Sequence, residues 1–228
     1  MEDPILEKPS EKPEEPEEDK GFFTRKVIIE IAIILGIVLV VFFGLKLVVQ
    51  SYRVDGASME TTFHDGDFLL VNKISYHLHS PRHGDVIIFH PPEGLLTTEP
   101  YVKRVVGLPG ERVEIRDNRV YIHTADGKVL QDPYVTPWNG NRTFPEEGVF
   151  GEDEYFVLGD NRDPGKSSDS RTWGTVPKGD IIGKVSLCYF PIGSWKLSPG
   201  YDTEEVDKIV SSEATCLSHN SSCALASP

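Results

Sequence analysis

The longest apolar run of the chain lies close to its N-terminus. Residues 27–49 are apolar apart from Glu30 and Lys46 near the two ends, and the run has no polar face. As a helix it would reach about 34 Å, enough to span a bilayer, whereas the alternative, a buried core helix, would normally show a polar face. Because no small-residue cleavage site follows closely, a removed signal peptide is disfavoured. The sequence predicts one transmembrane anchor over residues 27–49.

Basic residues flank this run almost equally on both sides. Arg25 and Lys26 precede its core, while Lys46 and Arg53 lie at and beyond its other end. The excess of Lys and Arg that marks the cytoplasmic side is therefore small. It favours a cytoplasmic N-terminus only slightly.

Beyond residue 50 the pattern changes to short apolar runs separated by turn residues. Alternation around Asp117-Asn118 predicts a β-hairpin, and Asp126-Gly127 predicts a further turn. The stretch 131–151 is rich in Pro, Gly and Asn and indicates an irregular excursion. We therefore expect a mostly β, antiparallel domain over residues 50–200. Its strands should fall in 67–74, 84–90, 101–108, 112–123, 153–160 and 180–190.

The two ends of the chain carry most of its negative charge. Residues 1–20 hold nine Asp or Glu against three Lys, and residues 201–228 hold five against one. The first segment also has four prolines and few apolar residues, so we expect a disordered acidic tail there and a disordered extension at 201–228. A net charge of −13 without a basic run argues against nucleic-acid binding.

Cysteine and histidine give no metal pattern. The three cysteines, Cys188, Cys216 and Cys223, are too few for a disulfide framework, and a Cys216–Cys223 disulfide and unpaired thiols remain equally open. His79 and His83 would share a helix face, but Ser80-Pro81 beside them indicates a loop. The sequence therefore predicts no metal and no cofactor.

Three polar-rich segments beside predicted strands could carry chemistry. Ser58 follows Gly56-Ala57, where small residues let a peptide backbone approach a hydroxyl. Lys103 stands between Val102 and Arg104 in an apolar run, so alternation could point one cation inward. A lysine activates a serine only when burial disfavours its ammonium form. Taken alone, Lys103 would be interpreted as an ordinary surface lysine.

Together these segments resemble the type I signal peptidases, membrane-bound serine proteases that remove signal peptides. The resemblance covers roughly residues 22–196 and implies the antiparallel β-sheet catalytic domain of that family behind one transmembrane helix. It rests on five features in the family's order: the anchor, Ser58-Met59, GDFLLVNK at 66–73, KRVVGLPG at 103–110, and GDNRD with SDSR at 159–171.

The resemblance implies roles for individual residues. Ser58 would be the nucleophile and its backbone N–H an oxyanion donor, Lys103 the general base, and Ser167 the hydroxyl that orients the lysine amine. An apparent two-residue insertion at 164–167 makes Ser168 a rival for that last role. Ion pairs bracing the site are implied for Arg104, Asp160, Asp169 and Arg171.

The family's shallow apolar pockets imply a cut after small-x-small sequences, because longer side chains would collide with the pocket walls. The residues that match the pocket lining are Val54, Met59, Phe63, Tyr101 and Val102.

Two positions in the nucleophile segment depart from the family pattern. Thr61 replaces a proline, and Gly56 stands where some members have an oxyanion-stabilising serine. Loss of such a donor costs about 3 to 4 kcal/mol where it is used, so a substitute donor or a water molecule is implied if the rate is ordinary.

The expected partners are secretory preproteins and the lipid bilayer. The resemblance implies a bacterial plasma membrane, with the catalytic domain on its outer side. Since Ser58 follows Val49 by nine residues, the site should lie near the bilayer surface. Two alternatives are an inactive, membrane-tethered binding module and a self-cleaving Ser-Lys repressor. The presence of both Ser58 and Lys103 argues against the first, and the anchor argues against the second.

Overall fold

The structure is a computed structural model, and it describes residues 20–92, 94–95, 97–198, 200 and 203–205. The predicted acidic tail, except for Lys20, and most of the predicted C-terminal extension lie outside these residues. The chain divides into two compact units, Met1–Leu45 and Lys46–Pro228, which are described separately below.

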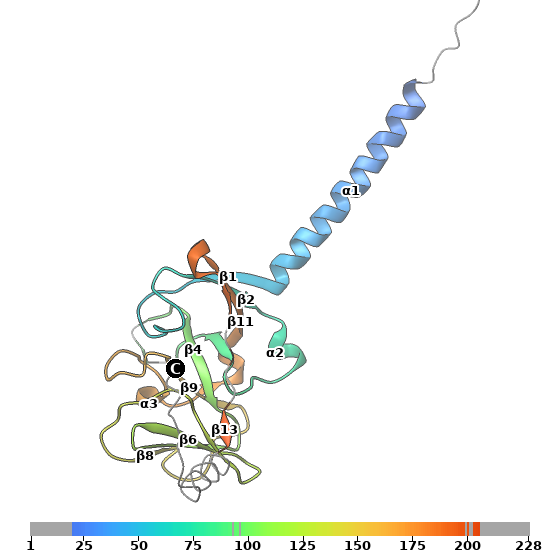
Figure 1. Ribbon diagram of the computed structural model, residues 1–228. Helices are drawn as coiled ribbons and strands as arrows, with labels where there is room; N and C mark the ends of the chain where they lie inside the picture. Colours follow the sequence, from blue (N-terminus) through green and yellow to red (C-terminus); the bar gives the residue numbers. More distant parts are fainter. Residues whose placement is uncertain (1–19, 93, 96, 199, 201–202, 206–228) are drawn as a thin grey trace, which may run out of the picture. The chain divides into compact units, whose positions relative to one another are not determined.

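Helix α1, Lys20–Val48, is the described element of the first unit (Figure 1). The part from Arg25 to Val48 is long and apolar enough to cross a membrane, and none of its most apolar window is buried within the protein. A core helix would be mostly buried, and a row of exposed Ile, Leu, Val and Phe is unfavourable in water. The helix therefore fits a membrane anchor. It ends one residue before the predicted limit, because Val49 already begins a strand.

The second unit contains two antiparallel sheets, and the larger one has eight strands. Its order is β1-β2-β11-β3-β4-β9-β10, with β12 paired to β11. The strands are β1 Val49–Arg53, β2 Phe68–Asn72, β3 Val86–Phe89, β4 Tyr101–Gly107, β9 Glu154–Leu158, β10 Val176–Pro177, β11 Ile181–Phe190 and β12 Lys196–Leu197.

The smaller sheet has five strands in the order β13-β7-β6-β5-β8. These are β5 Arg112–Arg116, β6 Arg119–His123, β7 Val129–Gln131, β8 Arg142–Phe144 and β13 Glu204–Glu205. Asp117 and Asn118 both have positive φ, 52° and 59°, as a two-residue hairpin turn between twisted strands requires. The predicted hairpin is confirmed.

The remaining described elements are four short helices: α2 Ser75–Leu78, α3 Ser170–Trp173, η1 Lys178–Asp180 and η2 Ile192–Ser194. All six segments predicted to contain strands do so. The predicted excursion at 131–151 contains one further strand, β8, which pairs with β5. Two residues of the predicted extension, Glu204–Glu205, pair with β7.

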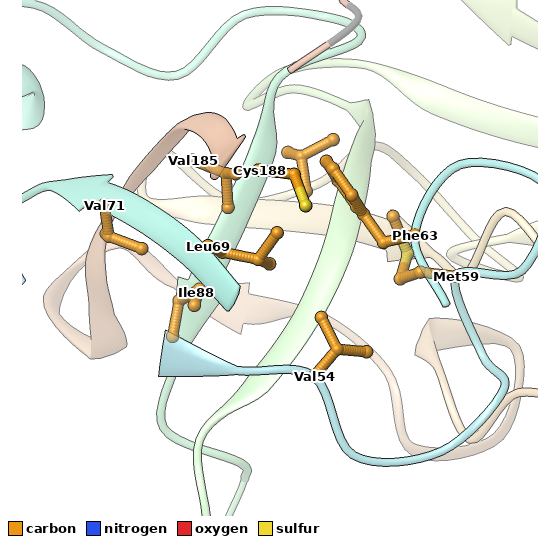
Figure 2. Close-up of a cluster of buried hydrophobic side chains, with 9 residues drawn as sticks. Val54, Met59, Phe63, Leu69, Val71, Ile88, Val185 and Cys188 are labelled. Atoms are coloured by element: carbon orange, nitrogen blue, oxygen red, sulfur yellow. The ribbon is translucent and has the colours of Figure 1, made fainter. Parts of the chain in front are cut away.

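The mostly antiparallel β fold is thus the observed one, and its core is divided between the two sheets. One cluster lies on the larger sheet and includes Val54, Met59 and Phe63 from the loop after β1 (Figure 2). A second cluster joins the sheets, since Val106, Phe156 and Leu158 of the larger sheet pack with residues of the smaller. The smaller sheet is therefore fixed against β4 and β9 by apolar burial.

Gly107, at the end of β4, marks a close approach between the two sheets. A Cβ there would lie 2.6 Å from Cε2 of Phe150 and 2.9 Å from Cγ2 of Val113. We expect Gly107→Ala to lower the free energy of unfolding by about 1 to 3 kcal/mol, because a packed core resists added volume. Chemical denaturation in detergent measures this. Gly179→Ala, where a Cβ meets nothing within 4 Å, is the matched control. An equal effect of the two changes would contradict the interpretation.

Candidate active site

Ser58 lies in the loop between β1 and β2, and the two ends of that loop are hydrogen-bonded to each other. The N–H of Val54 donates to the carbonyl of Asp67 at 2.8 Å, and the N–H of Gly66 donates to the carbonyl of Val54 at 3.0 Å. Met59, directly after Ser58, is completely buried in the core of the larger sheet (Figure 2). The serine is therefore held on a closed loop whose next side chain is anchored in the core.

Lys103 projects from β4 and reaches this serine. Its Nζ lies 2.7 Å from Oγ of Ser58 and also donates to the carbonyl of Val102 at 3.0 Å. β4 runs between β3 and β9 in the sheet, and only 4% of the lysine is exposed. The structure thus brings together the two residues predicted to react.

Burial changes the acid-base behaviour of this lysine. Desolvation of the ammonium lowers the pKa of Lys103 from 10.5 to about 8. The carboxylates of Asp169 and Asp160 oppose this shift, while Arg171 adds to it. At pH 7 about one tenth of the amine is therefore uncharged and able to accept a proton from the serine hydroxyl, far more than for an exposed lysine.

Two buried ion pairs surround the dyad, as the resemblance implied. Arg104, on the opposite side of β4 from Lys103, donates to both carboxylate oxygens of Asp160 at 2.7 and 2.6 Å. Arg171 donates to both oxygens of Asp169 at 2.8 Å. Since bidentate guanidinium-carboxylate pairs fix orientation as well as charge, they hold the loops around the site in one arrangement.

The loop after β9 connects these pairs to the nucleophile. The N–H of Asn161 donates to the carbonyl of Ser58 at 3.0 Å, and its side-chain amide donates to the carbonyl of Ala57 at 2.9 Å. In the same loop, the N–H of Gly159 donates to Asp169 at 3.1 Å. The backbone at the serine is therefore held from the β9 side as well as by its own loop.

Of the two candidate orienting serines, Ser167 is buried and Ser168 is exposed. A Cβ on Gly159 would collide with both the Ser167 hydroxyl and the Ser58 carbonyl, so the hydroxyl lies against the glycine beside the nucleophile. This hydroxyl is buried and makes no hydrogen bond to any described residue, Lys103 included. Burial favours Ser167 over Ser168, and its role in orienting the lysine remains a prediction.

The predicted pocket residues divide into covered and accessible ones. Met59 and Phe63 have no exposed surface and Val54 has 3%, so these three form part of the core (Figure 2). Val102 packs against the same cluster but is only partly buried. Tyr101 packs on a different cluster, and its ring lies 6.2 Å from that of Phe89. Among the five, Tyr101 and Val102 therefore offer the most surface to a substrate.

A third buried ion pair was not predicted from the sequence. Arg162 donates to Asp132 at 2.8 and 3.1 Å, and their side chains are 2% and 0% exposed. The arginine lies within the GDNRD motif, which marks this loop as part of the site. Its partner, however, lies 30 positions earlier in the predicted irregular excursion. No local pattern links the two.

Among the described residues, no group of three or more His, Cys, Asp or Glu is arranged to hold a metal ion.

Comparisons with known proteins match one family. The family described as "Signal peptidase, peptidase S26" matches residues 26–190. Signal peptidase I of Leptolyngbya laminosa is 38% identical over 164 residues, which cover 69% of this chain and 77% of the relative. Signal peptidase IB of Staphylococcus aureus (strain COL) is 32% identical over 189 residues, covering 75% and 94%.

A crystal structure of a signal peptidase I from Enterococcus faecalis V583 is also similar. It is 33% identical in sequence and covers 46% of this chain and 95% of its own, with a TM-score of 0.37. At that TM-score the structural similarity adds nothing to the sequence matches.

Thr61, where the family pattern has a proline, has a φ of 83°. Proline is restricted to a φ near −65°, so this loop cannot accept it without rearranging. We expect Thr61→Pro to lower the free energy of unfolding by more than about 1 kcal/mol, measured by chemical denaturation. Thr61→Gly is the control and should be tolerated, since glycine adopts positive φ readily. A proline variant as stable as the wild type would show that the loop does not need this conformation.

Proposed function

This chain belongs to the signal peptidase family, peptidase S26, and is a serine endopeptidase that removes signal peptides; we propose that Ser58 is its nucleophile and Lys103 its general base. The observation that carries the proposal is the 2.7 Å contact between Nζ of Lys103 and Oγ of Ser58. The lysine is also buried and its pKa lies near 8, as a lysine base acting near neutral pH requires.

The geometry supports a two-stage acyl transfer. As Oγ of Ser58 bonds to the scissile carbonyl carbon, its proton passes to the neutral amine of Lys103, and the carbonyl oxygen takes the displaced electron pair. Collapse of that intermediate breaks the C–N bond, and the ammonium returns the proton to the leaving amine. Water then attacks the ester carbonyl of the acyl-enzyme and gives a proton to the same lysine. The ester C–O bond breaks, Oγ of Ser58 takes that proton back, and the signal peptide leaves with a new carboxylate.

The developing oxyanion needs donors, and the backbone N–H of Ser58 is the one that the family resemblance supplies. Gly56 has no side chain to add a second donor. Ser167 would orient the lysine amine, because its buried hydroxyl stands beside the nucleophile with no described hydrogen-bond partner.

The substrates are exported preproteins cut after small-x-small sequences. The proposed pocket residues are Val54, Met59, Phe63, Tyr101 and Val102, of which Tyr101 and Val102 offer the most surface to a substrate. Exclusion of large residues rather than attraction of small ones would then set the specificity.

We place α1 in a bacterial plasma membrane, with its N-terminus in the cytoplasm and the catalytic unit on the outer side. Ser58 follows Val49, the first residue after α1, by nine residues. Its proposed substrate is a signal peptide that is still embedded in the membrane by its apolar segment.

Removal of either member of the dyad should abolish cleavage. Purified protein in detergent, given a precursor with a small-x-small junction, should cut it, while Ser58→Ala and Lys103→Ala should not. Lys166→Ala, which changes an exposed residue nearby, is the matched control. The products are identified by mass spectrometry of the new N-terminus. Cleavage by either dyad variant would exclude the proposed mechanism.

The pH dependence of cleavage should report the lysine. Because the amine must be neutral and its pKa is about 8, kcat/KM should fall as the pH drops below that value, by about tenfold for each unit. Initial rates across a buffered pH series test this. Circular dichroism of the same samples separates loss of activity from unfolding. A rate that stays constant well below pH 7 would rule out Lys103 as the base.

A further inference from the structure

The stretch 132–136, predicted to be irregular, binds Arg162 of the loop after β9. Asp132 accepts two hydrogen bonds from Arg162, and Thr136 accepts a third at 2.8 Å. All three side chains are buried. Since each guanidinium bond has fixed geometry, this set determines where Arg162 lies.

Arg162 in turn holds the loop that contacts the nucleophile. Its Nε donates to the carbonyl of Gly159 at 2.9 Å, and its own carbonyl accepts from Arg171 at 2.9 Å. Between these points, Asn161 donates to the carbonyls of Ser58 and Ala57. A displacement of Arg162 would therefore move the groups that fix the backbone at the serine.

Tyr134 lies between the Arg162–Asp132 ion pair and the Arg104–Asp160 ion pair. Its ring centroid lies 4.8 Å from the guanidinium carbon of Arg162 and 5.7 Å from that of Arg104. Its hydroxyl lies 3.3 Å from Oγ1 of Thr62, which donates to Asp160 at 2.5 Å. One aromatic side chain thus contacts the cations of two buried ion pairs and the loop that carries Ser58.

The smaller sheet anchors this segment. The N–H of Asp132 donates to the carbonyl of Val120 at 3.0 Å, and the N–H of Thr136 donates to the carbonyl of Asn118 at 2.8 Å. Residues 132–136 are therefore hydrogen-bonded to the β5–β6 hairpin on one side and contact the loops around Ser58 and Lys103 on the other.

Resting on the function proposed above, we propose that residues 132–136 are a positioning element of the active site, with Tyr134 and Arg162 as positioning residues. They touch neither substrate nor the reacting atoms. They hold loop 159–161, and through it the backbone at Ser58, in the geometry that the reaction needs. Misplacement of a catalytic group by a fraction of an ångström lowers the rate of the chemical step more than it lowers substrate affinity.

Tyr134→Leu and Tyr134→Phe separate positioning from general stability. The leucine removes the ring from both guanidinium groups, while the phenylalanine keeps the ring and removes only the hydroxyl. We expect Tyr134→Leu to lower kcat about tenfold with KM within about twofold of the wild type, and Tyr134→Phe to retain most of the activity. Rates are expressed per folded protein, at a temperature well below unfolding.

The matched control is Tyr121→Leu in the smaller sheet. Tyr121 is also partly buried, and its ring lies 4.7 Å from the guanidinium carbon of Arg116. It should lose a similar amount of thermal stability yet keep its kcat. If Tyr134→Leu likewise keeps its kcat, residues 132–136 have only a structural role and the proposal is wrong.

Amide hydrogen exchange gives a readout that does not need activity. Tyr134→Leu should accelerate exchange at the N–H of Asn161 at least about tenfold, with little change in the β5–β6 hairpin. Tyr121→Leu should leave exchange at the N–H of Asn161 unchanged. If the wild-type protein fails to cleave, the proposed function fails and the exchange result alone decides the positioning role. Unchanged exchange at Asn161 would overturn it.

Discussion

Burial of the Lys103 amine is the constraint on which the rest of the site depends. An ammonium group out of water is costly, and that cost lowers the lysine pKa towards 8. Lys103 projects from β4, which lies between β3 and β9 in the sheet, and only 4% of the lysine is exposed. The loop carrying Ser58 completes the cover and places the hydroxyl 2.7 Å from the amine.

Three buried arginines belong to the strand, loop and helix that form the site, and each is paired with a carboxylate. Arg104, Arg162 and Arg171 pair with Asp160, Asp132 and Asp169, and all six side chains are at most 5% exposed. Because each arginine is always charged and is matched by a carboxylate, the arginines contribute fixed geometry. The lysine has a shifted pKa and therefore supplies the change of protonation.

The two sheets have different parts in this arrangement. The larger sheet carries the lysine on β4 and the serine loop between β1 and β2. The smaller sheet packs on β4 and β9 through an apolar cluster and, through Asp132 and Thr136, reaches the loop that contacts Ser58. Apolar burial fixes the sheets to each other. The hydrogen bonds of Arg162 with Asp132 and Thr136, and of Asn161 with Ser58, then connect the smaller sheet to the backbone at the nucleophile.

The sequence by itself determined strands β2 to β6, β9 and β11, the Asp117-Asn118 hairpin and the apolar helix, because alternation, turn residues and a long apolar run are local signals. It also determined Ser58 and Lys103 as candidates, through motifs in a fixed order. Only the tertiary structure decided that Arg162 pairs with Asp132 and that Tyr134 joins two ion pairs, because the partners lie far apart in the chain. Such contacts depend on how the sheets pack, which no local pattern encodes.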